Sequence, residues 1–167
     1  MPEPGTDGGQ RPQWLAGGQT GGEASLAAGE TAESLFSQGL DNHDRGDFDK
    51  AIECYRKVIQ LDPTFVVAHN NLGMVYIDKD MFEEAIGSLK KTLELEPNYA
   101  EAYNNLGFVY RRLGDEIKAA AHYRKFLALE PDVEDGPKIQ AWLEGVIAEH
   151  GELPPVGPEA AAANAPT

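Results

Sequence analysis

The octapeptide His-Asn-Asn-Leu-Gly-Met-Val-Tyr at residues 69–76 returns almost unchanged as Tyr-Asn-Asn-Leu-Gly-Phe-Val-Tyr at residues 103–110. The two copies begin 34 residues apart and differ only at their first and sixth positions. Pro63, Pro97 and Pro131 keep the same spacing of 34, and each follows an acidic residue. A fixed period in this range is typical of stacked supersecondary units, so the sequence predicts a repeat protein.

Three copies of the unit align when Ala32, Val66 and Ala100 are each taken as position 1. Apolar residues at helical spacing then predict two antiparallel helices per unit. Glycine in a helix interior costs about 0.5–1 kcal/mol relative to alanine, so glycines in register at position 8 predict a close approach of the two helices, glycine facing alanine. The aligned residues are Gly39, Gly73 and Gly107 at position 8, Ala51, Ala85 and Ala119 at position 20, and Tyr55, Leu89 and Tyr123 at position 24.

The period and these positions resemble the tetratricopeptide repeat (TPR) over residues 32–133. The resemblance implies an all-α fold, a right-handed superhelical stack of helix-turn-helix repeats at about 32–65, 66–99 and 100–133. The first repeat departs most, with Gln38 and Asn42 where a leucine and an aromatic residue are expected.

A seventh helix is predicted at about 135–149, because an apolar stripe there keeps helical spacing. An open stack leaves its last apolar face bare, so this helix should cap it, with Trp142 as the main anchor. The stripe consists of Ile139, Trp142, Leu143, Val146 and Ile147. The TPR domain is thus expected at 31–150, between a disordered Gly-rich tail at 1–30 and a disordered Pro/Ala-rich tail at 151–167.

Composition narrows the class of partner. Asp and Glu number 28 against 14 Lys and Arg, a net charge of -14, which argues against nucleic acid. No stretch approaches about 18 consecutive apolar residues, so no membrane insertion is expected. A single cysteine, Cys54, forms no internal disulfide and fits a cytoplasmic location.

No arrangement of residues indicates catalysis. The histidines at 43, 69, 122 and 150 form no pair with metal-ligand spacing, and the sequence has no Gly-rich phosphate loop after a strand. We therefore expect neither an enzyme nor a cofactor.

The resemblance implies that the first helix of each repeat lines a concave groove. Positions 2, 5, 6, 9, 12 and 13 are expected to face it, because positions 7, 8 and 11 enter the helix pair. An apolar row at position 9 lies beside amides, whose donor and acceptor atoms suit a peptide backbone. The candidate groove residues are Asn71 and Asn105 at position 6, Asn70 and Asn104 at position 5, Leu40, Met74 and Phe108 at position 9, and Arg112 at position 13.

Each group also has a structural interpretation that stays open. The amides could bond adjacent repeats, the apolar row could belong to the core between repeats, and Arg112 could complement the dipole at its helix C-terminus. Chaperone-binding relatives clamp a C-terminal carboxylate with five residues, of which only Asn71 has a counterpart here. The other four places hold Phe36, Leu40, Glu101 and Asn105, so no carboxylate clamp is predicted. Arg111 and Arg112 could still attract an acidic group at one end of the groove.

We therefore expect a non-catalytic protein-protein interaction module, an adaptor or assembly factor that binds a peptide of a partner protein in the groove. Two alternatives remain. One is a self-associating scaffold that forms a homo-oligomer, and the other is an accessory subunit that docks a catalytic partner through its convex face. The sequence leaves the oligomeric state open, from a monomer to weak self-association.

Overall fold

The computed structural model describes residues 30–157 of the chain. This part contains seven α-helices and no strand, which confirms the all-α class. The helices are α1 (Ala32–Asp44), α2 (Phe48–Leu61), α3 (Val66–Asp78), α4 (Phe82–Leu95), α5 (Ala100–Arg112), α6 (Glu116–Leu129) and α7 (Gly136–His150). The expected tails lie outside the described residues, apart from Glu30 and the segment 151–157.

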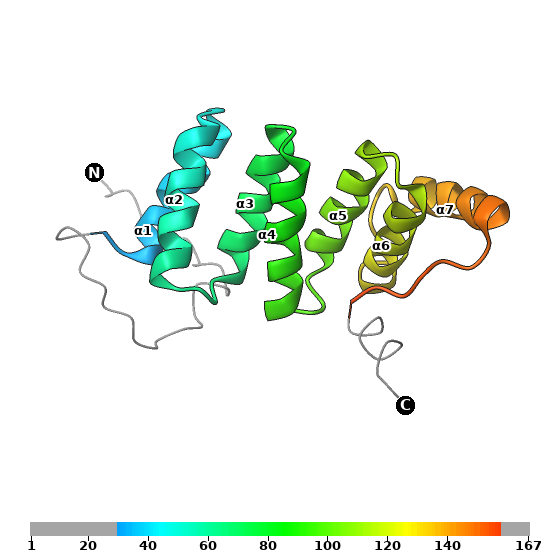
Figure 1. Ribbon diagram of the computed structural model, residues 1–167. Helices are drawn as coiled ribbons and strands as arrows, with labels where there is room; N and C mark the ends of the chain where they lie inside the picture. The colour runs from blue at the N-terminus through cyan, green and yellow to red at the C-terminus, as the bar shows by residue number, and fades with distance from the viewer. Residues whose placement is uncertain (1–29, 158–167) are drawn as a thin grey trace, which may run out of the picture.

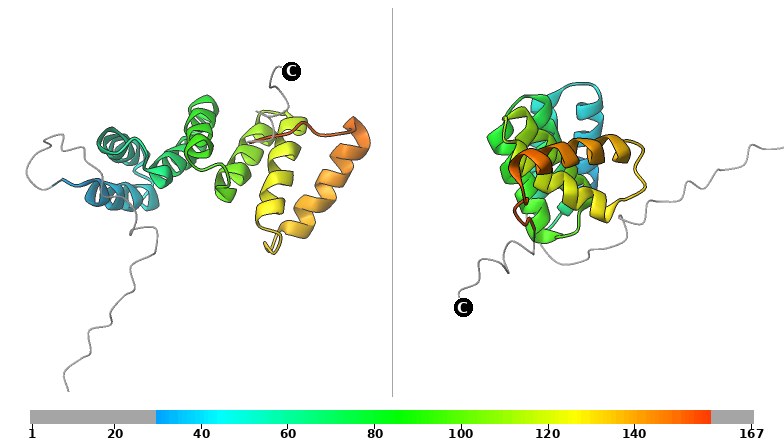
Figure 2. Two further views of the ribbon diagram at one scale, coloured as in Figure 1. Left: turned by 90° about the horizontal axis from the view of Figure 1, so that it is seen from below. Right: turned by 90° about the vertical axis from the view of Figure 1, so that its right-hand side faces the viewer.

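The first six helices form three antiparallel hairpins, which stack side by side in a row (Figure 1). Neighbouring hairpins meet through α2 with α3 and through α4 with α5, and α5 also packs on α3. The helix α7 packs on α6 and closes the C-terminal end of the row, as the turned views in Figure 2 show. This arrangement is the predicted superhelix of helix-turn-helix repeats.

The glycines at position 8 do bring the two helices of each repeat together. A Cβ atom on Gly107 would lie 2.8 Å from the ring of Tyr123, and one on Gly73 would lie 2.8 Å from Leu89. The facing residue is therefore the large side chain at position 24, whereas the alanine at position 20 was expected to fill this place. The missing methyl group makes room for a ring or a leucine, which explains why glycine is required in a helix interior.

Each hairpin turns through one residue in the left-handed backbone conformation, at Gly46, Asp80 and Gly114, with φ of 77°, 55° and 78°. Glycine adopts this conformation without steric cost, and aspartate tolerates it better than most residues. These turns connect the two antiparallel helices of each repeat.

The capping helix begins one residue later than expected, after Asp135, with Pro137 in its first turn, where a missing N–H costs nothing. Leu143 and Val146 are buried, and the Trp142 ring meets Tyr123 edge-on at 5.7 Å. Trp142 therefore anchors the cap as predicted. Ile147 differs from the expectation, because it is 40% exposed on the outer side of α7.

The segment 151–157 packs against the repeats, although it was expected to belong to a disordered tail. Leu153 is only 4% exposed, and Arg124 Nη2 donates to the carbonyl oxygens of Leu153 and Pro154 at 3.5 and 3.2 Å. Arg56 holds the same position 25 in repeat 1, and it donates to the Tyr76 hydroxyl of repeat 2 at 2.8 Å. The C-terminal segment thus supplies the acceptors for Arg124 that the following repeat supplies for Arg56.

Candidate functional site

Four positions of each first helix form one continuous line along it. Positions 2, 6, 9 and 13 are related as i, i+4, i+7 and i+11, which places them on one face of an α-helix. We call these three lines the first-helix strips. All twelve members are at least partly exposed. They are Glu33, Ser37, Leu40 and Asp44 on α1, Val67, Asn71, Met74 and Asp78 on α3, and Glu101, Asn105, Phe108 and Arg112 on α5.

The apolar row at position 9 is accessible in two of the three repeats. Met74 is 37% exposed and Phe108 is 40% exposed, whereas Leu40 is partly buried against the core of repeats 1 and 2. The alternative of a core role between repeats therefore holds in part for Leu40. Met74 and Phe108 leave large apolar side chains open to solvent on adjacent first helices.

In repeats 1 and 2, position 5 does not face the groove as expected. Asn70 is completely buried, and Phe36, at position 5 of repeat 1, is 3% exposed, with its ring 5.2 Å from that of Phe65. This side of the helix turns toward the next repeat, where Asn70 Nδ2 lies 3.5 Å from Glu101 Oε2. Asn70 is therefore a junction residue, and its side chain does not reach the surface.

The two amides at position 6 have different surroundings. Asn105 Nδ2 donates to Asn70 Oδ1 at 3.4 Å, so the repeated Asn-Asn pairs meet across the junction of repeats 2 and 3. This contact gives Asn105 a structural role, while part of its side chain remains accessible. Asn104, at position 5 of the last repeat, is also partly accessible.

Asn71 lies beside the buried hydroxyl of Tyr55. Burial raises the pKa of Tyr55 to about 12, and the neighbouring Asn71 amide opposes that rise. The hydroxyl nevertheless has no partner with hydrogen-bond geometry in the part of the chain that the structure describes. The contact is therefore loose, and the Asn71 amide keeps hydrogen-bonding capacity toward a ligand.

Arg112 ties the strip of repeat 3 to repeat 2. Its Nη2 donates to Asp80 Oδ1 at 3.0 Å, and its guanidinium carbon lies 5.4 Å from the ring centre of Phe82 and 5.8 Å from that of Phe108. Sequence reasoning missed Asp80 and Phe82, which lie in the turn and at the start of α4. Arg112 also lies in the last turn of α5, as the dipole interpretation requires.

Polar contacts between side chains join repeats 1 and 2 at the same edge of the stack. His43 Nε2 lies 2.7 Å from Asp78 Oδ2, and Lys79 pairs with Asp49. These contacts connect the hairpin-turn ends of repeats 1 and 2.

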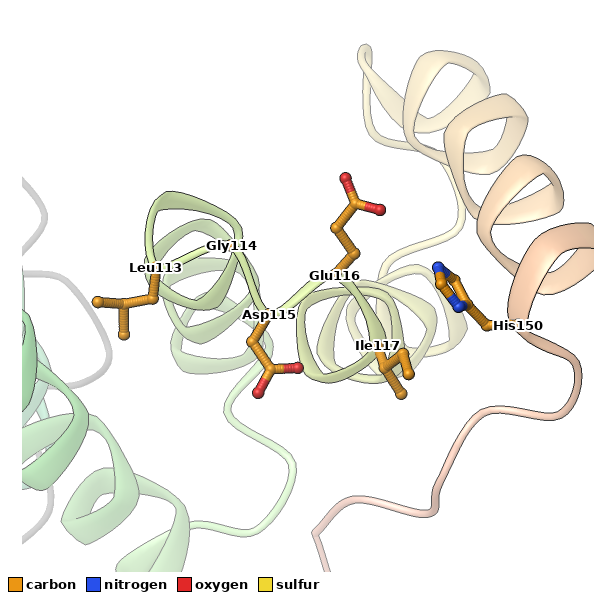
Figure 3. A pocket seen from close by; sticks show the side chains of 6 residues that line it. All are labelled: Leu113, Gly114, Asp115, Glu116, Ile117 and His150. Carbon is orange, nitrogen blue, oxygen red and sulfur yellow. The ribbon is translucent and has the colours of Figure 1, made fainter.

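A shallow surface pocket lies near the C-terminal end, between the α5–α6 turn and the end of α7 (Figure 3). The sequence did not predict it. Asp115 caps α6 by accepting from the Lys118 backbone N–H at 3.0 Å, and the Lys118 ammonium group beside it lowers the pKa of that carboxyl. The acidic group here is thus structural. The pocket is lined by Leu113, Gly114, Asp115, Glu116, Ile117 and His150.

Within residues 30–157, no three metal-ligating side chains cluster as a metal site would require. None of the helices described there has both the length and the apolar character needed to cross a membrane.

Comparison with known families identifies the same repeats. A family model described as TPR repeat matches residues 39–80 and 75–114, and one described as Tetratricopeptide repeat matches residues 100–133. A search of curated proteins finds no significant match.

Solved structures share the fold, with a TM-score of 0.65 in each of three cases. The first TPR of Spaghetti (RPAP3), bound to the HSP90 peptide SRMEEVD, is 26% identical, and the match covers 70% of this chain and 93% of that one. MamA is 29% identical over 75% of this chain and 71% of its own. The Arabidopsis OM64 TPR domain is 21% identical over 68% and 94%, which shows the fold alone.

Proposed function

Because the chain belongs to the tetratricopeptide repeat family, we propose that it is a non-catalytic adaptor or assembly factor that binds a peptide segment of a partner protein along the first-helix strips. Relatives of this fold support a protein-interaction role, since one of them was solved with a bound peptide. The proposed ligand lies along the first-helix strips, with its main apolar contacts on α3 and α5, where the accessible strip residues of two repeats adjoin.

The observation that carries the proposal is the exposure of Met74 and Phe108 beside partly accessible amides. Solvent-exposed apolar side chains are unfavourable in water, so a partner that buries them gains binding free energy. Asn71 and Asn105 would meet the backbone of an extended peptide, while the apolar pair would hold its side chains.

The test is selection from a displayed library of random dodecamer peptides on immobilised full-length protein. The wild type should enrich a related set of sequences, and the double variant Met74→Ser/Phe108→Ser should lose that set. The matched control is Ile117→Ser/Ile147→Ser, which removes two apolar side chains that are each 40% exposed elsewhere.

The control should retain the enriched set, and both double variants should melt close to the wild type, because their targets are exposed. Enrichment that survives the Met74/Phe108 change would refute the proposed surface. If only the Ile117→Ser/Ile147→Ser control loses the enriched set, the peptide binds at the C-terminal end of the stack.

A second double variant, Asn71→Ala/Asn105→Ala, separates binding from structure. Weaker peptide binding with a nearly unchanged melting temperature assigns the amides to the ligand. Unchanged binding with a lower melting temperature would assign them to the junctions instead.

A further inference from the structure

The first-helix strips carry a strong excess of negative charge. Four carboxylates lie on them, at Glu33, Asp44, Asp78 and Glu101, against the single cation Arg112. The charge also has a direction along the stack. The strip of α1 carries two acids, that of α3 one, and that of α5 one acid with Arg112.

The single cation is already engaged. Arg112 is bonded to Asp80 and lies over two aromatic rings, so it is not presented to an incoming anion as an isolated charge. Its ion pair with Asp80, which is 67% exposed, places a further carboxylate beside the strip.

Most of the acids lack such compensation. Glu33 and Asp44 are exposed and form no ion pair with any residue in the range 30–157. Glu101 lies near the neutral amide of Asn70, which leaves its charge in place. Asp78 has His43 as its partner. The uncompensated charge is therefore greatest on repeat 1.

We infer that the peptide bound along the strips is cationic and apolar, with Lys or Arg over repeat 1 and a large apolar side chain against Phe108 of repeat 3. The inference rests on the proposed function and adds the chemistry of the ligand. Opposite charges across an interface speed encounter and discriminate against like-charged partners. An acidic peptide such as the one bound by the Spaghetti TPR is disfavoured at this surface.

The composition of the selected library tests the inference directly. Enriched dodecamers should carry net positive charge and at least one large apolar residue. One such dodecamer, labelled with fluorescein, then serves as the probe for affinity measurements by fluorescence anisotropy.

Neutralising the acids of repeat 1 with Glu33→Gln/Asp44→Asn should weaken binding of this probe by about 2-fold to 25-fold, since each of the two exposed pairs contributes about 1.4-fold to fivefold. The matched control is Glu53→Gln/Glu134→Gln, which makes the same change in net charge at exposed sites off the strips. The affinity of this control variant for the probe should stay within about twofold of the wild-type value. Added salt should weaken binding of the probe to the wild type more than its binding to the Glu33→Gln/Asp44→Asn variant.

An enriched set that is neutral or acidic overturns the inference, and so does equal weakening by the two charge variants. Either result leaves the proposed function intact, provided that enrichment still requires Met74 and Phe108. A set that persists without those two side chains refutes the proposed function itself.

Discussion

Replacing Gly107 with alanine should destabilise the stack, although alanine is the better helix former. A Cβ atom at this position would meet three atoms of the Tyr123 ring at 2.8, 2.8 and 2.9 Å. Tyr123 has little room to retreat, because it is 7% exposed and the Trp142 ring packs against it in a T-shaped arrangement, with ring centres 5.7 Å apart. Either the ring or the helix axis must shift to admit the methyl group.

The magnitude follows from two opposing terms. Glycine to alanine in a helix interior gains about 0.5–1 kcal/mol. Overpacking a well-filled core costs about 1–3 kcal/mol. The expected net loss is about 0–2.5 kcal/mol, with a central value of about 1 kcal/mol. Gly87 in α4 provides the control, since its added Cβ would meet nothing within 4 Å. Gly87→Ala should therefore stabilise the protein by about 0.5–1 kcal/mol.

Urea unfolding followed by far-UV circular dichroism measures both variants against the wild type. Both substitutions gain the same helix propensity. The difference in unfolding free energy between Gly107→Ala and Gly87→Ala therefore isolates the cost of overpacking. In a Tyr123→Ala background, Gly107→Ala should no longer destabilise, because the ring is gone. Equal stability of the Gly107→Ala and Gly87→Ala proteins would refute the steric explanation.

Three further outcomes are expected. Burial lowers the pKa of His122 below 6.5, so the unfolded chain binds the proton more readily. Stability should then fall as the pH drops below about 6.5, and melting curves of His122→Gln should show a smaller loss. Leu153→Ala should cost about 2–4 kcal/mol in urea unfolding, whereas Pro155→Ala, at an exposed site in the same segment, should cost far less. Arg112→Ala should change the unfolding free energy by about 1 kcal/mol or less, because its pair with Asp80 is solvent-exposed. A loss several times larger in the same unfolding assay would contradict that assignment.

The repeat period was sufficient to predict the helices and the face that each buries within its hairpin. Leu106 and Tyr110 are buried, and Gly107 meets the second helix, because helical periodicity determines which residues share a face. The same periodicity does not say where the neighbouring repeat lies around that helix. Asn70 was therefore assigned to the groove, although the packing of one repeat on the next encloses it completely.

The packing of the C-terminal segment on the repeats was not predicted, for a different reason. Residues 151–157 have neither helical nor strand periodicity, so no local pattern indicates that they pack. Their order depends on tertiary contacts, the burial of Leu153 and the hydrogen bonds from Arg124. One signal was present in the sequence, because arginine recurs at position 25 in Arg56 and Arg124. Its first copy bridges to the following repeat, which indicates that the second also needs a partner beyond α6.

The covered C-terminal end determines what kinds of assembly the chain can build. Linear growth by head-to-tail addition needs the far side of the last repeat to receive the first repeat of another copy. Here α7 and Leu153 already occupy that side. A contact between the opposite ends of two copies would join like surfaces, and such a contact closes as a pair with two-fold symmetry. The side chains that complete the core at this end therefore block head-to-tail growth in which one repeat stacks directly on another.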